Sequence, residues 1–148
     1  MGRALGIDFG ERRIGIALSD PEGRFAVPWG TIERQTDRRA AYRIADLAKS
    51  EAVEWVVIGE PLDLEGRAGE SSERVRRFGA RIERATRLPV QWIDEALTTV
   101  EASERLRRAD LDHRDHPERR DAVAAQILLQ EALDRRASDD EPDGYSDE

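Results

Sequence analysis

Cysteine is absent from this sequence of 148 residues, and aromatic residues and long apolar runs are scarce. Without cysteine the chain can hold no disulfide framework, no thiolate zinc site and no cysteine nucleophile. The longest apolar runs, counting glycine, are five residues long and lie at 14–18 and 55–59. Neither run can form a transmembrane helix or the core of a signal peptide. We therefore expect a soluble, cytoplasmic protein with no membrane partner.

Lysine is nearly absent as well, because Lys49 is the single lysine among 24 basic residues. Arginine binds phosphate in a bidentate manner, but a GC-rich genome produces the same bias, so the arginine count alone does not establish nucleic-acid binding. The net charge of −8 comes mostly from residues 139–148, which hold six acids and no base. The length fits one domain. We expect that domain to cover residues 1–137 and an acidic tail, residues 138–148, to be disordered, since the tail has no aliphatic residue to bury.

Apolar segments alternate along the chain between the periodicity of strands and that of helices. Three strand-like segments come first, and alternating helices and strands follow them. This order predicts an α/β fold with a mixed five-stranded sheet, whose first three strands form an antiparallel meander, and with helices on both faces. The expected strands are 3–9, 14–19, 24–33, 54–59 and 90–94, and the expected helices are 37–51, 70–86, one capped by Thr98 or Thr99 that ends near 108, and about 117–136, with a polar loop at 109–117.

Most of the aromatic residues fall inside the expected strands. We therefore expect them to lie in the core and to leave little surface on which nucleic-acid bases could stack. They are Phe9, Phe25, Trp29, Trp55 and Trp92.

Three carboxylates stand where a charge is unfavourable or where ligands usually gather. Asp8 lies in an apolar strand among small residues, and it needs an arginine, backbone amides or a metal as its partner. Glu95 follows the fifth strand, at the carboxyl edge where α/β sheets bind ligands. Asp121 heads the apolar stripe of the last helix. Structural explanations remain open: Asp8 could bond the following turn, Asp94 and Glu95 could cap the next helix, and Asp121 could stabilise the helix dipole.

These three acids could converge at one end of the sheet. Carboxylates gathered in that way repel each other unless divalent cations lie between them. Oxygen ligands favour Mg²⁺ or Mn²⁺. Two such ions about 3.5–4 Å apart are the usual arrangement for in-line displacement at a phosphodiester. The pattern therefore predicts a two-metal-ion phosphodiesterase with Asp8, Glu95 and Asp121 as catalytic residues and metal ligands.

Four segments, in this order, resemble the YqgF (RuvX) family of ribonuclease H-like nucleases. They are LGIDFGERRIGIALSD, VVIGEPLDLEGRAGESSERVRRF, LPVQWIDEALTTVEA and RRDAVAAQILLQEALD, and together they extend from about residue 3 to 135. The resemblance implies the ribonuclease H-like fold and a divalent-metal nuclease that matures the 5′ end of precursor 16S rRNA or resolves Holliday junctions. Matched by position, Asp8 is the metal ligand of the first strand, Glu95 the acid of the Asp-Glu-x-Leu-Thr-Thr motif and Asp121 the acid of the last helix.

The resemblance also bears on nucleic-acid binding. Arg13 matches the family's basic residue in the first hairpin, and Arg120 lies in the basic run before the aspartate of the last helix. We expect Arg12, Arg13, Arg119 and Arg120 to bind nucleic acid, either structured RNA such as precursor rRNA on the ribosome or branched DNA. Monomer and homodimer both remain open, because junction resolution requires a dimer.

Two positions depart from the family pattern. Glu60 stands where the family usually has leucine, and Ala96 stands where it usually has arginine. We expect Glu60 to point to solvent rather than to act as an outer ligand. We expect Ala96 to remove one phosphate or carboxylate contact.

Two interpretations from other classes remain. An actin-like ATP-binding protein also begins with a GIDFG-type hairpin, but that architecture needs two such domains. A non-catalytic nucleic-acid-binding module is the other alternative, and the presence of all three acids disfavours it. His113 and His116 have a metal-like spacing, but they fall in a polar loop without a third ligand, so we expect them to be surface residues.

Overall fold

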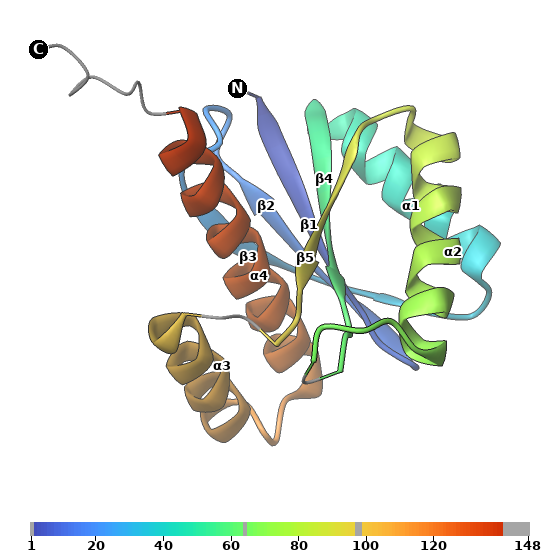
Figure 1. The fold of residues 1–148 in the computed structure, drawn as a ribbon. Coiled ribbons are helices and arrows are strands. Elements are labelled where there is room, and N and C mark those ends of the chain that lie inside the picture. The colour runs from blue at the N-terminus through green and yellow to red at the C-terminus, as the bar shows by residue number, and fades with distance from the viewer. Residues whose placement is uncertain (1, 64, 97–98, 141–148) are drawn as a thin grey trace, which may run out of the picture.

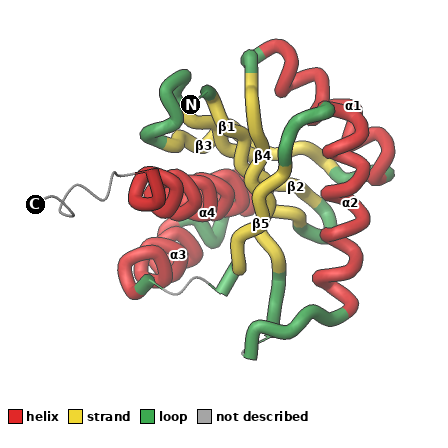
Figure 2. Tube along the Cα trace, turned by 45° about the horizontal axis from the view of Figure 1, so that its top comes forward, coloured by secondary structure: helices red, strands yellow, loops and turns green. Residues whose placement is uncertain are grey.

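Five strands form one mixed sheet with two helices on each face in the computed structural model, which describes residues 2–63, 65–96 and 99–140 (Figure 1). Helices α1 and α2 cover one face, and α3 and α4 cover the other, as Figures 1 and 2 show. Cover on both faces explains why the central strands are almost wholly apolar. The elements are β1 (Arg3–Phe9), β2 (Arg13–Ser19), β3 (Ala26–Glu33), α1 (Asp37–Ser50), β4 (Val53–Glu60), α2 (Glu70–Thr86), β5 (Val90–Asp94), α3 (Val100–Asp112) and α4 (Pro117–Asp140).

The strand order in the sheet is β3-β2-β1-β4-β5. The first three strands form the predicted antiparallel meander, and β4 and β5 run parallel to β1. Because parallel strands end at the same edge of a sheet, the carboxyl ends of β1, β4 and β5 lie together. The start of β2 lies at that edge too. This edge is therefore where Asp8 and Glu95 meet.

One apolar layer fills the space on each side of the sheet. Ile7 packs with Phe78 in the layer under α1 and α2, whereas Leu129 packs in the layer under α4. Successive side chains of a strand point to opposite faces. Since Ile7 faces α1 and α2, its neighbour Asp8 faces α4. A Cβ at Gly6, on the same face as Asp8, would lie 2.8 Å from the Cβ of Leu129.

Both helices on the α4 face are longer than predicted. Helix α3 continues to Asp112, because the buried stripe of Ala102 extends to Ala109 and carries the helix into the expected polar loop. Helix α4 continues to Asp140, so residues 138–140 are helical instead of part of a disordered tail, and residues 141–148 lie outside the described residues. Within the described ranges, no helix is both long enough and apolar enough to cross a membrane.

The expectation that the strand aromatics form core is wrong for two of them. Trp55 is buried, and Phe9 and Trp92 pack partly buried against the core. Trp29 is 47% exposed and Phe25 is 67% exposed. Both belong to the β3 side of the molecule, and β3 is an edge strand, so its flank has no neighbouring strand to cover it.

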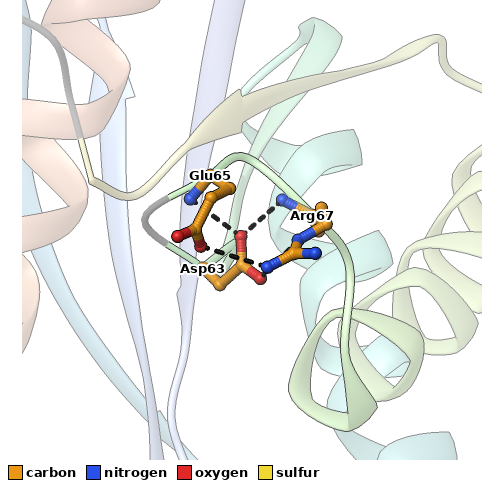
Figure 3. A network of polar contacts seen from close by, with 3 residues as sticks. All are labelled: Asp63, Glu65 and Arg67. Atoms are coloured by element: carbon orange, nitrogen blue, oxygen red, sulfur yellow. Dashed lines mark hydrogen bonds and ion pairs between the residues drawn. The ribbon is translucent and has the colours of Figure 1, made fainter.

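The loop between β4 and α2 is organised by Asp63 (Figure 3). Its Oδ1 accepts hydrogen bonds from the backbone N–H groups of Glu65 and Arg67, at 3.0 and 2.7 Å. The Arg67 side chain donates to Asp63 at 3.2 Å and to Glu65 at 3.3 Å. All three residues are exposed, so these ion pairs shape the loop and add little to the free energy of folding. The loop leaves the sheet at the same edge as Asp8.

Candidate active site

Asp8 and Glu95 form the centre of the candidate active site. Asp8 is the penultimate residue of β1, and Glu95 directly follows β5. Their side chains share a hydrogen bond. The backbone N–H of Glu95 donates to the carbonyl oxygen of Glu60 at 3.0 Å, which extends the pairing of β4 and β5 by one residue. The sheet edge thus brings together two predicted residues that are far apart in the sequence.

Two glycines make room for the carboxylates. A Cβ at Gly59 would lie 2.9 Å from the Cγ of Glu95, so the Glu95 side chain lies directly over the backbone of β4. Gly15 is paired with Asp8 in the register of β1 and β2, and a Cβ there would collide with the carbonyl oxygen of Asp121. The start of α4 therefore lies against the sheet next to Asp8, and a larger residue at Gly15 would displace it.

Burial raises the pKa of both central carboxyl groups. It raises the pKa of Glu95 to about 8, and the hydrogen bond to Asp8 and the charges of Asp8 and Asp94 contribute. Burial likewise raises the pKa of Asp8; the Glu95 hydrogen bond and Arg120 oppose the rise, and the charge of Asp121 adds to it. Burial and the mutual repulsion of the two carboxyl groups therefore disfavour two negative charges at this place.

Asp121 lies close to this pair but is held by arginines. Its Oδ2 accepts a hydrogen bond from the Nε of Arg13 at 3.0 Å, and its Oδ1 lies 3.6 Å from the Nε of Arg120. Its charge nevertheless raises the pKa of Asp8. Arg13 and Arg120, which we expected to bind nucleic acid, thus also neutralise a carboxylate of the candidate site.

The other two predicted arginines lie on either side of this site. Arg12 is exposed in the turn between β1 and β2, and its carbonyl oxygen accepts from the backbone N–H of Arg34. Arg119 is exposed on the first turn of α4 and lines a pocket next to β3. Both guanidinium groups are therefore accessible to a phosphate near the carboxyl edge.

Asp110 is a further carboxylate near the site, and the sequence interpretation missed it. It lies in α3, where a loop was expected, and its charge raises the pKa of Asp8. The sequence carried a signal for it, since Ala102, Leu106 and Ala109 continue one helical stripe beyond residue 108.

Two more arginines beside Glu95 were also missed. A pocket of about 200 Å³ has Glu95, Phe9, Arg34 and Arg74 in its wall. The guanidinium of Arg34 lies 4.3 Å from the centre of the Phe9 ring. No local pattern separates these two arginines from the many others in the sequence, so only the folded chain identifies them.

The expectation that Glu60 faces solvent is wrong. Its side chain is 9% exposed and faces α2, on the opposite side of the sheet from Asp8. It accepts hydrogen bonds from the hydroxyl of Ser72 and from Arg76, whose NH2 lies 2.6 Å away. The hydrogen bond with Arg76 holds the pKa of Glu60 below its usual value. The arginine, which also stacks 4.2 Å from the Trp92 ring, makes the buried charge tolerable.

Asp94 has a structural role, but it does not cap the next helix, which is the role that the sequence left open. Its Oδ1 accepts a hydrogen bond from the backbone N–H of Ala96 at 2.8 Å, so it stabilises the turn after β5. The next helix is capped by Thr99, whose side chain accepts from the N–H of Ala102. Thr98, the other predicted cap, lies outside the described residues.

The donor set suits a divalent metal ion in its chemistry. Asp8 and Glu95 offer hard oxygen ligands, and a cation would relieve the repulsion that raises their pKa values. Among residues 2–63, 65–96 and 99–140, no three acidic or histidine side chains are already grouped closely enough to hold an ion. Asp121 is the nearby third acid, and its carboxylate is engaged by Arg13.

A family model described as "RuvX: Holliday junction resolvase" matches residues 2–135. The chain belongs to the RuvX family. The resemblance seen in the four sequence segments is thereby confirmed, and so is the prediction of an enzyme that hydrolyses phosphodiester bonds.

Other RuvX proteins match this chain over nearly its whole length. A protein of Chloroflexus aurantiacus is 41% identical over 134 residues, which are 90% of this chain and 88% of the relative. One of Maridesulfovibrio salexigens is 37% identical over 133 residues, covering 90% of this chain and 98% of the relative. Both carry the name "Putative pre-16S rRNA nuclease".

Solved structures confirm the ribonuclease H-like fold expected for a RuvX protein. Thermus thermophilus RuvC in complex with a Holliday junction substrate superposes with a TM-score of 0.59 and 17% identity, over 93% of this chain and 96% of that one. The fowlpox virus resolvase bound to Holliday junction DNA gives a TM-score of 0.57 at 7% identity, over 90% and 98%. At such low identity the likeness describes the fold alone.

Proposed function

We propose that this RuvX protein is a divalent-metal-dependent nuclease that matures the 5′ end of precursor 16S rRNA in the cytoplasm. The observation that carries the proposal is the buried Asp8–Glu95 pair at the carboxyl edge, with the charge of Asp121 acting on it. A fold under no functional constraint would not retain two acids whose pKa values are both raised by burial. The names of the relatives support the choice of precursor rRNA as substrate.

Asp8, Glu95 and Asp121 are the residues that would hold Mg²⁺ or Mn²⁺. A bound divalent cation supplies positive charge at the scissile phosphate and lowers the pKa of a water ligand. In the reaction the oxygen of water adds to phosphorus and the 3′-oxygen leaves, so the products carry 5′-phosphate and 3′-hydroxyl ends. The nearest arginines form ion pairs with Asp121, and the charge of Arg120 offsets the raised pKa of Asp8 only in part.

The protein's own residues orient the substrate. The side chain of Arg120 is 38% exposed, so it can bind a phosphate oxygen while it restrains Asp121. Arg12 and Arg119 are exposed on the two sides of the carboxylates and extend this positive rim. Arg34 and Arg74 line the pocket beside Glu95 and provide phosphate contacts on that side.

Resolution of Holliday junctions is the second candidate. The family description favours it. A resolvase makes paired symmetric nicks, so it must act as a dimer, whereas rRNA maturation requires one site. A non-catalytic nucleic-acid-binding module is the third candidate and predicts binding without cleavage.

The deciding experiment compares two labelled substrates under the same conditions. The full chain is incubated with precursor 16S rRNA and with a four-way DNA junction, each with Mg²⁺, Mn²⁺ or EDTA. We expect cleavage of the rRNA precursor with either metal, none in EDTA, and none by Asp8→Asn. Symmetric nicking of the junction with the rRNA left intact would favour resolution, and binding without cleavage in every metal would rule out the nuclease.

A further inference from the structure

Trp29 is an exposed aromatic side chain at an unusual place in the sheet. In the pairing of β2 and β3, Ile16 faces Gly30 and the next residue, Ala17, faces Pro28, so Trp29 is the extra residue of a β-bulge. A bulge redirects the side chain it contains and bends the strand. Trp29 is 47% exposed, although burying a tryptophan ring is among the most favourable contributions to folding.

The ring lies in the wall of a pocket of about 380 Å³. Ala122 and Val123 of α4 form the apolar side of this pocket, and its polar groups come from Arg119, His113 and Glu118. An apolar wall with an exposed indole suits the face of a planar ring. The guanidinium and imidazole suit the phosphate or the polar edge attached to such a ring.

The pocket continues into a second hollow between α3 and α4. The second hollow has a volume of about 330 Å³ and shares His113 and Val123 with the first. Arg105 and Arg108 line it. The surface from Trp29 across the α3–α4 groove is therefore aromatic at one end and carries three arginines against two acids, Glu118 and Asp112. An aromatic platform beside an excess of arginine is typical of proteins that bind single-stranded nucleic acid.

Trp29 and Asp8 lie on the same face of the sheet. Trp29 lines a pocket whose other wall is formed by α4. Asp8 is paired with Gly15, and Gly15 lies directly under the start of α4. Strand β3 is two strand spacings from β1, and Trp29 is two residues from Thr31, the partner of Gly15, so the side chains are on the order of 10–15 Å apart. Arg119 lines the pocket together with Trp29, and its neighbour Arg120 lies 3.6 Å from Asp121. The start of α4 therefore connects the pocket to the carboxylates.

We propose that the Trp29 pocket binds an unpaired nucleotide of the substrate, whose base stacks on the indole while its strand crosses the start of α4 to the carboxylates. This proposal rests on the proposed nuclease function and adds a substrate class to it: the strand must be single-stranded a few nucleotides from the cleaved bond. A base in a duplex has no free face to offer, so the pocket selects loops, bulges and unpaired ends.

A second copy of this chain is the competing occupant of the exposed β3 edge. Pro28 has no N–H to donate, and the bulge at Trp29 interrupts the edge, so addition of a strand from another copy is disfavoured there. The arginines of the adjoining groove favour an anionic occupant instead.

The test measures binding without cleavage. The full chain is titrated in EDTA against a fluorescein-labelled short single-stranded RNA and against the duplex of the same sequence, with anisotropy as the readout. We expect Trp29→Ala to weaken binding of the single strand by about tenfold, Trp29→Phe to retain most of it, and the duplex to be affected little. Arg119→Gln should reduce the slope of log K against log salt by about one.

Tyr42→Ala is the matched control, because Tyr42 is a 54% exposed aromatic residue on α1, across the sheet, and it too lines a pocket that contains arginines. RNA should also quench the tryptophan emission of the wild type more than that of Trp29→Phe. The proposal is overturned if the wild type does not bind the single strand, if Trp29→Ala and Tyr42→Ala bind equally, or if Trp29→Ala converts a dimer into a monomer in sedimentation. Because no cleavage is measured, loss of the nuclease proposal and loss of this one give different results.

Discussion

At the scale of the residue, the Asp8–Glu95 pair concentrates negative charge where the surroundings stabilise it poorly. We predict that Asp8→Asn abolishes cleavage, because the substitution keeps the size of the side chain and removes one anionic oxygen ligand. In the metal-free protein the same change removes carboxylate repulsion, so the melting temperature should stay level or rise. Cleavage assays and thermal melts in EDTA, with and without added Mg²⁺, measure the two effects.

Asp46→Asn is a suitable control for this change, since Asp46 is exposed on α1. Asp110 would be unsuitable, because its charge acts on Asp8. If Asp8→Asn instead unfolds the protein and Mg²⁺ has no effect on the melting temperature of the wild type, Asp8 is a structural residue and the candidate site loses its central member.

The raised pKa of Glu95 predicts a pH dependence of the metal-free protein. The folded state holds this proton up to a pKa of about 8, whereas the unfolded chain releases it near 4.5. Between these values the folded state binds more protons, so its stability is fully present below pH 4.5 and is lost as the pH rises toward 8. Melting temperatures in EDTA should fall across this window.

Two comparisons isolate the contribution of Glu95. Glu95→Gln should flatten the decline with pH, because an amide has no proton to lose. Addition of Mg²⁺ near pH 8 should raise the melting temperature of the wild type, since the cation favours the charged carboxylates. An equally steep decline in Glu95→Gln would assign the pH dependence to other groups.

At the scale of the element, Glu60 connects β4 to α2. We predict that Glu60→Gln lowers the free energy of unfolding by about 1–3 kcal/mol, because a charged acceptor of the Ser72 and Arg76 hydrogen bonds is lost. Since Arg76 holds the pKa of Glu60 low, this contribution is present above the unfolded pKa of 4.5 and disappears as the pH falls below the folded value. Urea unfolding of both proteins at neutral and acidic pH measures it. Glu83→Gln, an exposed change on the same helix, should have little effect.

Gly15 determines how closely α4 approaches the sheet. We predict that Gly15→Ala destabilises the protein by about 1–3 kcal/mol, because the new methyl group collides with the backbone at Asp121 and α4 must shift. Cleavage should fall as well, since the shift moves Asp121 away from Asp8. Gly69→Ala is the comparison, because a Cβ there has nothing within 4 Å. Equal effects of the two changes on activity would show that the position of α4 is unimportant for the site.

At the scale of the whole molecule, charge is unevenly distributed along the chain. Residues 141–148 follow α4 and contain four acids, no base and no aliphatic residue. We predict that deleting them leaves the melting temperature nearly unchanged, because they contain little to bury. The deletion should also strengthen nucleic-acid binding at low salt, since fewer negative charges repel phosphate, and this gain should vanish at high salt.

Thermal melts and binding titrations at two salt concentrations check the deletion. A full-length variant in which serine and glycine replace the four acids separates the effect of charge from that of length. A large fall in melting temperature would instead mean that this segment packs against the domain.

Most of the architecture could be predicted from the sequence. The periodicity of strands and helices is a local property of the sequence, so the order of the elements and the antiparallel meander could be predicted from it. Strand β5 and helix α2 begin and end at the predicted residues. The ends of α3 and α4 were misplaced, because polar residues continue a helix when one of its faces is covered by another helix. The closeness of Asp8 and Glu95 could also be predicted, because the carboxyl ends of parallel strands lie at one edge of a sheet.

The sequence by itself determined the fold class and the family and singled out the candidate acids, since each of these depends on residue order and spacing alone. Tertiary structure decided which partner each side chain has. Glu60 is buried because its face of β4 meets α2 and finds Arg76 there, Asp121 is bonded to Arg13 because α4 crosses β2, and Trp29 is exposed because β3 is an edge strand with a bulge. Such partners come from segments distant in the sequence, and their approach depends on sheet order and on glycines such as Gly15, which no local pattern encodes.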